Sequence, residues 1–127
     1  EPIQTYGDLR NPNVVKLVTN QQSIALYFSR APIPWPRDLM DAANTEASLP
    51  EGYDFSRHIG IYAYRVRELN DFVTWPVAPI EATEKLEQLR FMWHGVSIHG
   101  AQALQPVPGG IDTEEDLKAV IDLIKNI

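Results

Sequence analysis

The chain has 127 residues, of which 44% are hydrophobic and 22% charged, and its 17 acidic and 11 basic side chains give a formal net charge of −6. This length suits one domain, and an acidic composition without a run of Lys and Arg argues against nucleic-acid or anionic-membrane binding. The lack of Cys excludes disulfide scaffolds, zinc–thiolate sites and thiol nucleophiles, and no run of about 18 apolar residues could span a membrane.

The first third of the chain predicts a hairpin followed by a stiff loop. Residues 14–19 and 24–29 are rich in β-branched and aromatic side chains, and the polar residues 20–23 between them are typical of a turn. Residues 32–36 carry three prolines in alternation, which excludes a helix there and indicates an extended loop.

The rest of the chain alternates between predicted strands and helices. Strands are expected at 57–65 and 97–104, and helices at 68–75 and 80–93, the second closed by Gly95. Thr113 is expected to cap a final amphipathic helix, whose first turn is acidic. This mixture predicts an α/β or α+β fold.

The helix at 80–93 carries several carboxylates, which need separate interpretations. For Glu81 and Glu84 a solvated helix face is the favoured interpretation. Glu87 and Gln88 stand between two leucines, in the part of the helix that must pack, and their acceptors and amide donors suit recognition of vicinal hydroxyls. Spacing alone leaves their role open between structure and binding.

Two further residues are candidates for chemistry. His58 lies in a strand-like run, where a hydrogen-bonded structural role is more common than a catalytic one. Asp112 follows two glycines and directly precedes a helix start, so it is either part of a helix cap or a ligand for a hard cation such as magnesium. One Asp cannot make a magnesium site alone. No glycine-rich phosphate-binding loop occurs in the chain, so any nucleotide-binding loop must lie elsewhere.

Four blocks, in order, resemble the 3-deoxy-manno-octulosonate (Kdo) cytidylyltransferase family. They are Tyr27–Trp35 (YFSRAPIPW), Arg57–Arg65 (RHIGIYAYR), Glu84–Arg90 (EKLEQLR) and Gly110–Leu117 (GIDTEEDL), and Asn11–Lys16 (NPNVVK) fits the family's entry to the first block. The resemblance covers only the C-terminal half of such an enzyme. It implies an α/β fold: the C-terminal half of a Rossmann-like nucleotidyltransferase, with a mixed sheet and a hairpin-containing dimerisation region around residues 14–35.

The resemblance also implies an activity and a set of site residues. The reaction is transfer of CMP from CTP to Kdo, giving CMP-Kdo and pyrophosphate for lipopolysaccharide biosynthesis in the cytoplasm. Arg30 is implied as a catalytic and substrate-binding residue, and Asp112 as a catalytic ligand of Mg²⁺. His58, Tyr62, Glu87 and Gln88 are implied to bind Kdo, which favours function over structure for His58 and for the Glu87–Gln88 pair.

The family's CTP loop and its other magnesium carboxylate have no counterpart in this sequence, and the chain starts at Glu1 without an initiator Met or a signal peptide. We therefore expect residues 1–127 to be one portion of a cytidylyltransferase domain, inactive alone, whose partners are CTP, Kdo, the missing N-terminal half and a second copy in a homodimer. The alternatives are a non-catalytic sugar-acid-binding or dimerisation module, and a cytidylyltransferase for a related sugar acid.

Overall fold

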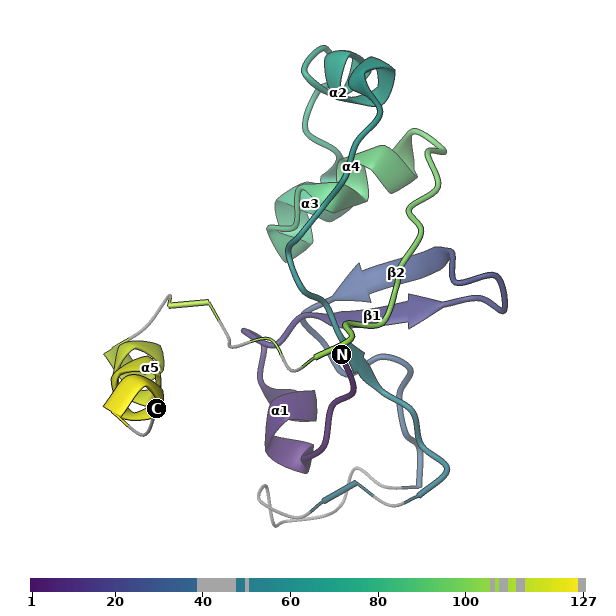
Figure 1. Ribbon diagram of the computed structural model, residues 1–127. Coiled ribbons are helices and arrows are strands. Elements are labelled where there is room, and N and C mark those ends of the chain that lie inside the picture. The colour runs from purple at the N-terminus through teal and green to yellow at the C-terminus, as the bar shows by residue number, and fades with distance from the viewer. Residues whose placement is uncertain (39–47, 50, 106, 108–109, 112–113, 126–127) are drawn as a thin grey trace.

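A three-stranded antiparallel sheet organises the chain in the computed structural model, which describes residues 1–38, 48–49, 51–105, 107, 110–111 and 114–125 (Figure 1). Its strands are β1 (Lys16–Thr19), β2 (Ala25–Ser29) and β3 (Ser56–Arg57), in the order β2-β1-β3. The mixed sheet implied by the resemblance is therefore wrong for the described strands. A short turn joins β1 to β2, and so short a connection can only make an antiparallel pair.

The β1–β2 hairpin confirms the prediction for residues 14–29. Lys16 pairs with Ser29 and Leu17 with Phe28, and the register shifts between Val18 and Thr19. The side-chain oxygen of Asn20 accepts hydrogen bonds from the main-chain N–H groups of Gln22 and Ile24, each at 2.9 Å. An Asn side chain that satisfies nearby main-chain donors is a common turn device, so the polar turn has a local cause.

Helices α3 (Pro79–Glu84) and α4 (Gln88–Trp93) lie beside the hairpin (Figure 1). Ala25 and Phe28 of β2 form a buried cluster with Leu86 and Leu89. Burial of the Phe28, Leu86 and Leu89 side chains is worth roughly 1.5–3 kcal/mol each, so this cluster is a main source of stability for the described part.

The single helix predicted over 80–93 is wrong, because the chain breaks at Lys85. Lys85 has φ 56° and ψ 47°, and its N–H donates to the carbonyl of Glu81 at 2.7 Å, which ends α3. A left-handed non-glycine residue costs roughly 1–2 kcal/mol, and helical periodicity does not reveal it. Gly95, with φ +79°, follows α4 as predicted.

The predictions of strands at 57–65 and 97–104 are mostly wrong, because β3 ends at Arg57 and residues 97–104 form no strand in the described chain. The sheet continues past Arg57 only through the N–H of His58, which donates to the carbonyl of Val15 at 2.8 Å. In the second segment, His99 forms one isolated bridge with Ile24. Beyond His58 the N–H of Ile61 donates to the carbonyl of Ile59 at 2.8 Å, so the chain makes a tight turn there instead of continuing as a strand.

Helix α1 (Tyr6–Arg10) was not predicted, although its start carries a local signal. The hydroxyl of Thr5 accepts a hydrogen bond from the N–H of Asp8 at 3.1 Å, which is an N-terminal cap. Leu9 of this helix packs with Ile3 and Phe55 in a second buried cluster. The pattern Thr-x-x-Asp could have identified the helix.

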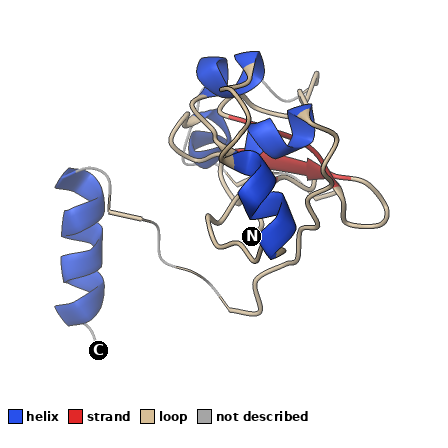
Figure 2. Cartoon of the chain, turned by 90° about the horizontal axis from the view of Figure 1, so that it is seen from above, coloured by secondary structure: helices blue, strands red, loops and turns tan. Residues whose placement is uncertain are grey.

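Helices α2 (Val66–Phe72) and α5 (Glu114–Lys125) complete the described chain. They correspond to the predicted helix at 68–75 and to the final helix, with α2 starting two residues earlier than expected. In both views α5 stands apart from the sheet and the other helices (Figures 1 and 2). Among the described residues, no helix is long and apolar enough to cross a membrane.

Candidate functional site

His58 and Tyr62 form a hydrogen-bonded pair in the wall of a groove. The phenol oxygen of Tyr62 lies 2.6 Å from Nε2 of His58. The His58 ring makes a T-shaped contact with the ring of Phe28 of β2, with ring centroids 5.1 Å apart. The resemblance assigned both residues to sugar binding, and the structure brings them together in the segment that follows β3.

The groove has a volume of about 790 Å³, which is large enough for a sugar acid. One wall is the segment from His58 to Arg65, continued by Glu68 of α2. The opposite wall is the chain from Gly95 to Ala101, which follows α4. Arg65 and Glu68 were not singled out from the sequence. The lining therefore mixes apolar side chains with polar groups that can hold a hydroxylated ligand.

Burial controls the charge of the His58–Tyr62 pair. It lowers the pKa of His58 and raises the pKa of Tyr62, and the nearby Tyr64 and Glu87 raise the pKa of Tyr62 further. Both side chains are consequently neutral at pH 7. A neutral pair can exchange hydrogen bonds with hydroxyl groups.

Stacked aromatic rings fix the position of the groove wall, the segment from His58 to Arg65, against α4. Tyr62 stacks on Tyr64 at 5.6 Å between centroids, Tyr64 on Phe91 at 5.3 Å, and Phe91 on Phe72 of α2 at 4.5 Å. Such pairs add roughly 0.5–1.5 kcal/mol each beyond burial. The groove wall therefore keeps its shape without being a strand.

Glu87 and Gln88 stand at the start of α4. Glu87 is exposed, and its carboxylate raises the pKa values of both Tyr62 and Tyr64, so it lies on the same side of the molecule as the groove wall. Gln88 is only 6% exposed, and its Nε2 has no hydrogen-bond partner among the described residues. A buried amide donor without a partner is unfavourable by about 1–3 kcal/mol, so this position carries an unmet hydrogen-bonding demand in the described structure.

Arg30 follows β2 and is held by other parts of the chain. Its Nε donates to the main-chain carbonyl of Glu84 at 2.7 Å, and Nη1 donates to the carbonyl of Pro12 at 2.9 Å. Arg30, Glu87 and Gln88 are not in the lining of the groove. In the described structure the predicted residues thus form a groove pair and flanking groups, and not one continuous cluster.

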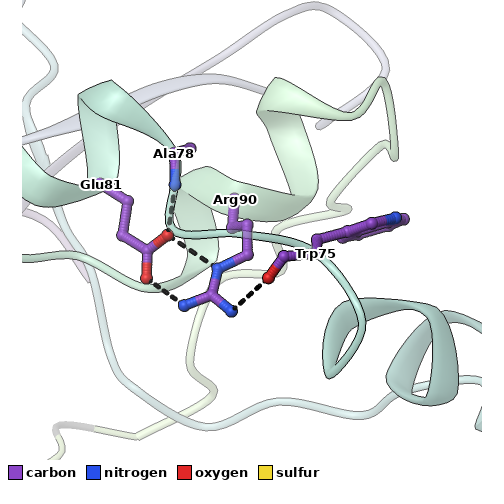
Figure 3. Close-up of polar contacts among 4 residues, drawn as sticks. All are labelled: Trp75, Ala78, Glu81 and Arg90. Carbon is purple, nitrogen blue, oxygen red and sulfur yellow. Dashed lines mark hydrogen bonds and ion pairs between the residues drawn. The ribbon is translucent and has the colours of Figure 1, made fainter.

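Glu81 is not part of a solvated face, and that prediction is wrong. Its side chain is buried and forms a bidentate ion pair with Arg90, with Oε1 2.5 Å from Nη2 and Oε2 2.8 Å from Nε (Figure 3). Oε2 also accepts the N–H of Ala78 at 3.0 Å. The hydrogen bond from Arg90 holds the pKa of Glu81 below its usual range. The pair ties α4 to α3, and the bond from Ala78 caps the start of α3.

Arg90 extends this connection to α2. Its Nη1 donates to the carbonyl of Trp75 at 3.3 Å (Figure 3). Its guanidinium lies 4.2 Å from the ring centroid of Phe72. Periodicity hid this role, since a carboxylate and a guanidinium nine residues apart on a supposed single helix would not be paired. The break at Lys85 brings them together.

The predicted magnesium ligand Asp112 lies outside the described residues. Within the described part of the chain, no group of three or more His, Asp or Glu side chains could hold a metal ion. The magnesium site therefore stays a prediction, and the donor chemistry of a lone carboxylate is compatible with it but incomplete.

Known proteins resemble this chain over nearly all of it. A family model described as Cytidylyltransferase matches residues 1–98. The 3-deoxy-manno-octulosonate cytidylyltransferase of Hahella chejuensis is 57% identical over 94% of this chain and 46% of its own length. That of Pseudomonas syringae pv. syringae is 54% identical over 98% of this chain and 48% of its own length.

A solved structure gives the same picture for the fold. CMP:2-keto-3-deoxy-manno-octonic acid synthetase complexed with CTP superposes with a TM-score of 0.80 at 34% identity, over 98% of this chain and 46% of that one. The chain thus spans about half the length of the curated relatives that it matches.

Proposed function

Because the chain belongs to the cytidylyltransferase family, we propose that it is the Kdo-binding part of a 3-deoxy-manno-octulosonate cytidylyltransferase. The enzyme would transfer CMP from CTP to Kdo, forming CMP-Kdo and pyrophosphate for lipopolysaccharide synthesis in the cytoplasm. The observation that carries the proposal is the identity above 50% with relatives of that name over nearly the whole chain. The groove with its neutral His58–Tyr62 pair supports it.

In this proposal the His58–Tyr62 pair forms hydrogen bonds with hydroxyl groups of the sugar. In the tautomer we propose, the phenol donates to Nε2 of His58 and the neutral ring carries its proton on Nδ1, from which it would donate to a Kdo oxygen. The stacked rings hold both groups in place before the sugar binds, which reduces the entropy lost on binding.

Glu87 and Gln88 would bind further Kdo hydroxyls. The exposed Glu87 carboxylate supplies acceptors, and the buried Nε2 of Gln88 supplies a donor that lacks a partner among the described residues. Arg30 would pair with an anionic group, either the Kdo carboxylate or a phosphate of CTP, since a guanidinium suits both.

We also propose that the reaction requires Mg²⁺, with Asp112 as one of its ligands. A magnesium ion bound there would neutralise phosphate charge during transfer. A second carboxylate from the nucleotide-binding half would have to complete the site.

The enzyme is further proposed to act as a homodimer through the hairpin region. On the hairpin Leu26 is 57% exposed, and Trp35 in the loop that follows is 62% exposed. Apolar side chains this exposed on a strand and an adjoining loop suit a subunit contact. Sedimentation of the complete enzyme should give the mass of two copies, and Trp35→Ser should shift it toward one.

Reconstitution tests the activity. This chain is mixed with the nucleotide-binding half of a relative, CTP, Kdo and Mg²⁺, and pyrophosphate release is measured. We expect release from the mixture and none from this chain alone. A folded complex that stays silent with Kdo, or turnover by the isolated chain, would contradict the proposal.

The second candidate is a non-catalytic sugar-acid-binding module, which the groove alone would also suit. Calorimetric titration with Kdo separates the two. Tight Kdo binding that neither CTP nor the nucleotide-binding half alters, together with no pyrophosphate release, favours the module. A cytidylyltransferase for a related sugar acid would release pyrophosphate with that acid in preference to Kdo.

A further inference from the structure

Glu84 makes two hydrogen bonds with Arg30, whose guanidinium group takes part in the proposed reaction. Its Oε2 accepts the main-chain N–H of Arg30 at 3.0 Å, and its own main-chain carbonyl accepts Nε of Arg30 at 2.7 Å. One residue of α3 thereby restrains both the backbone and the side chain of Arg30.

The Glu84 carboxylate is fixed in turn by β2. Its Oε1 accepts the hydroxyl of Ser29 at 2.7 Å, and the same hydroxyl oxygen accepts the N–H of Ala31 at 3.0 Å. Hydrogen bonds to a charged acceptor are roughly twice as strong as neutral ones, so this series of hydrogen bonds holds the Glu84 carboxylate firmly. These hydrogen bonds join the end of β2 to the end of α3, which are more than 50 residues apart in sequence.

Lys16 places a second cation beside this arrangement. It is fully buried, and its Nζ donates to the carbonyls of Asn11 at 2.8 Å and Val14 at 2.5 Å. Burial lowers the pKa of Lys16 to about 8, while Glu84 raises it and Arg30 lowers it, so the three charges lie near one another. With Lys16 charged, two cations and one anion leave this corner positive, which suits an anionic substrate group.

Pro12 completes the restraint by accepting Nη1 of Arg30 at 2.9 Å. Nη2 then remains the guanidinium nitrogen that donates to no atom of the described residues. We propose that Glu84 is a positioning residue for Arg30, which fixes the guanidinium so that its Nη2 edge is available to a carboxylate or phosphate of the substrate. The proposal rests on the proposed function, which puts Arg30 at the reaction site.

A double-mutant cycle tests the proposal in the complete enzyme. Glu84→Gln should lower kcat/KM for Kdo by about tenfold, the effect of losing one hydrogen bond to a charged group. Arg30→Ala should lower it more. If Glu84 acts through Arg30, the double variant should be no worse than Arg30→Ala alone. A further loss of about tenfold in the double variant would assign Glu84 an independent role and overturn the proposal.

Two variants control for folding and for charge. Ser29→Ala keeps both charges and both bonds between Glu84 and Arg30, and removes the bond to Oε1 together with the one from the N–H of Ala31, so it should lower kcat/KM by a smaller factor in the same direction. Asp71→Asn removes an exposed carboxylate of α2, whose ion pair with Arg67 is 3.8 Å long, and should leave kcat/KM unchanged. An effect of Asp71→Asn equal to that of Glu84→Gln would mean that net charge alone is responsible, against the proposal.

Amide hydrogen exchange on this chain separates failure of the proposal from failure of the proposed function. The N–H of Arg30 should be protected in the wild-type chain and lose protection in Glu84→Gln, whatever reaction the enzyme performs. If the wild-type enzyme releases no pyrophosphate, the proposed function fails while loss of protection still supports the restraint by Glu84. Unchanged protection at Arg30 would overturn the positioning role.

Discussion

The hydroxyl of Tyr62 can be removed without disturbing the aromatic stack, which makes Tyr62→Phe an informative variant. The ring would still stack on Tyr64 and lie against His58, with centroids 5.6 and 5.5 Å away. The variant loses only the 2.6 Å hydrogen bond to Nε2 of His58. Any change can therefore be attributed to that bond.

The expected loss of stability follows from the surroundings of His58. A net hydrogen bond contributes about 0.5–1.5 kcal/mol, and a buried nitrogen left without a partner costs about 1–3 kcal/mol. His58 is half-buried beside the groove, so water can reach the vacated position and the lower range applies. We expect Tyr62→Phe to lower the free energy of unfolding by about 1 kcal/mol.

The same variant should change the titration of His58. In the proposed tautomer the phenol donates to the neutral ring and favours the neutral form, so its removal should raise the pKa of His58, while burial still holds it below the usual value. NMR titration of the ring protons of His58 measures this. Urea unfolding at pH 7.5 measures the stability, and Tyr53→Phe, at an exposed tyrosine, is the matched control. A His58 titration identical in wild type and Tyr62→Phe, with stability within about 0.3 kcal/mol, would refute the reasoning.

Four further outcomes are expected. Stability should fall as pH drops through about 6.5, because burial lowers the pKa of His58 and the unfolded chain takes up the proton first; urea midpoints for wild type and His58→Gln should converge at low pH, and parallel curves would contradict this. Leu89→Ala, at a fully buried position, should destabilise the chain by about 2–5 kcal/mol, and a loss under about 1 kcal/mol in urea unfolding would argue against the buried cluster. Glu87→Ala should raise KM for Kdo in the complete enzyme and leave KM for CTP unchanged; an effect on CTP alone would contradict its role. Asp112→Asn should remove most of the magnesium-dependent rate with little change in melting temperature, and a normal rate at saturating Mg²⁺ would exclude it as a ligand.

Local chemistry was enough to predict the elements that depend on few residues. The hairpin, the stop after α4 at Gly95 and the final helix follow from alternation, a polar turn, a glycine and an amphipathic pattern. The block containing His58 and Tyr62 was recognised from its letters, and the structure brings the two side chains into a hydrogen bond. Neither the partner of His58 nor the groove beside it could be derived from spacing.

Long-range pairing could not be predicted in the same way. Glu81 and Glu84 had the spacing of a solvated helix face, yet one is buried against Arg90 and the other holds Ser29 and Arg30. Both sets of contacts depend on the left-handed residue Lys85, which changes the direction of the chain between α3 and α4. A helical wheel drawn through residue 85 assigns these carboxylates to the wrong environment.

The composition argued against nucleic-acid and anionic-membrane binding and excluded cysteine-based sites, and the four ordered sequence blocks indicated the family. Net negative charge and the lack of Cys depend on residue identity alone, so they could be used before any fold was known. The tertiary structure decided which carboxylates are buried, which rings stack and how Arg30 is held. Those contacts join residues that are far apart in the chain, and their energies exist only once burial has removed the groups from water.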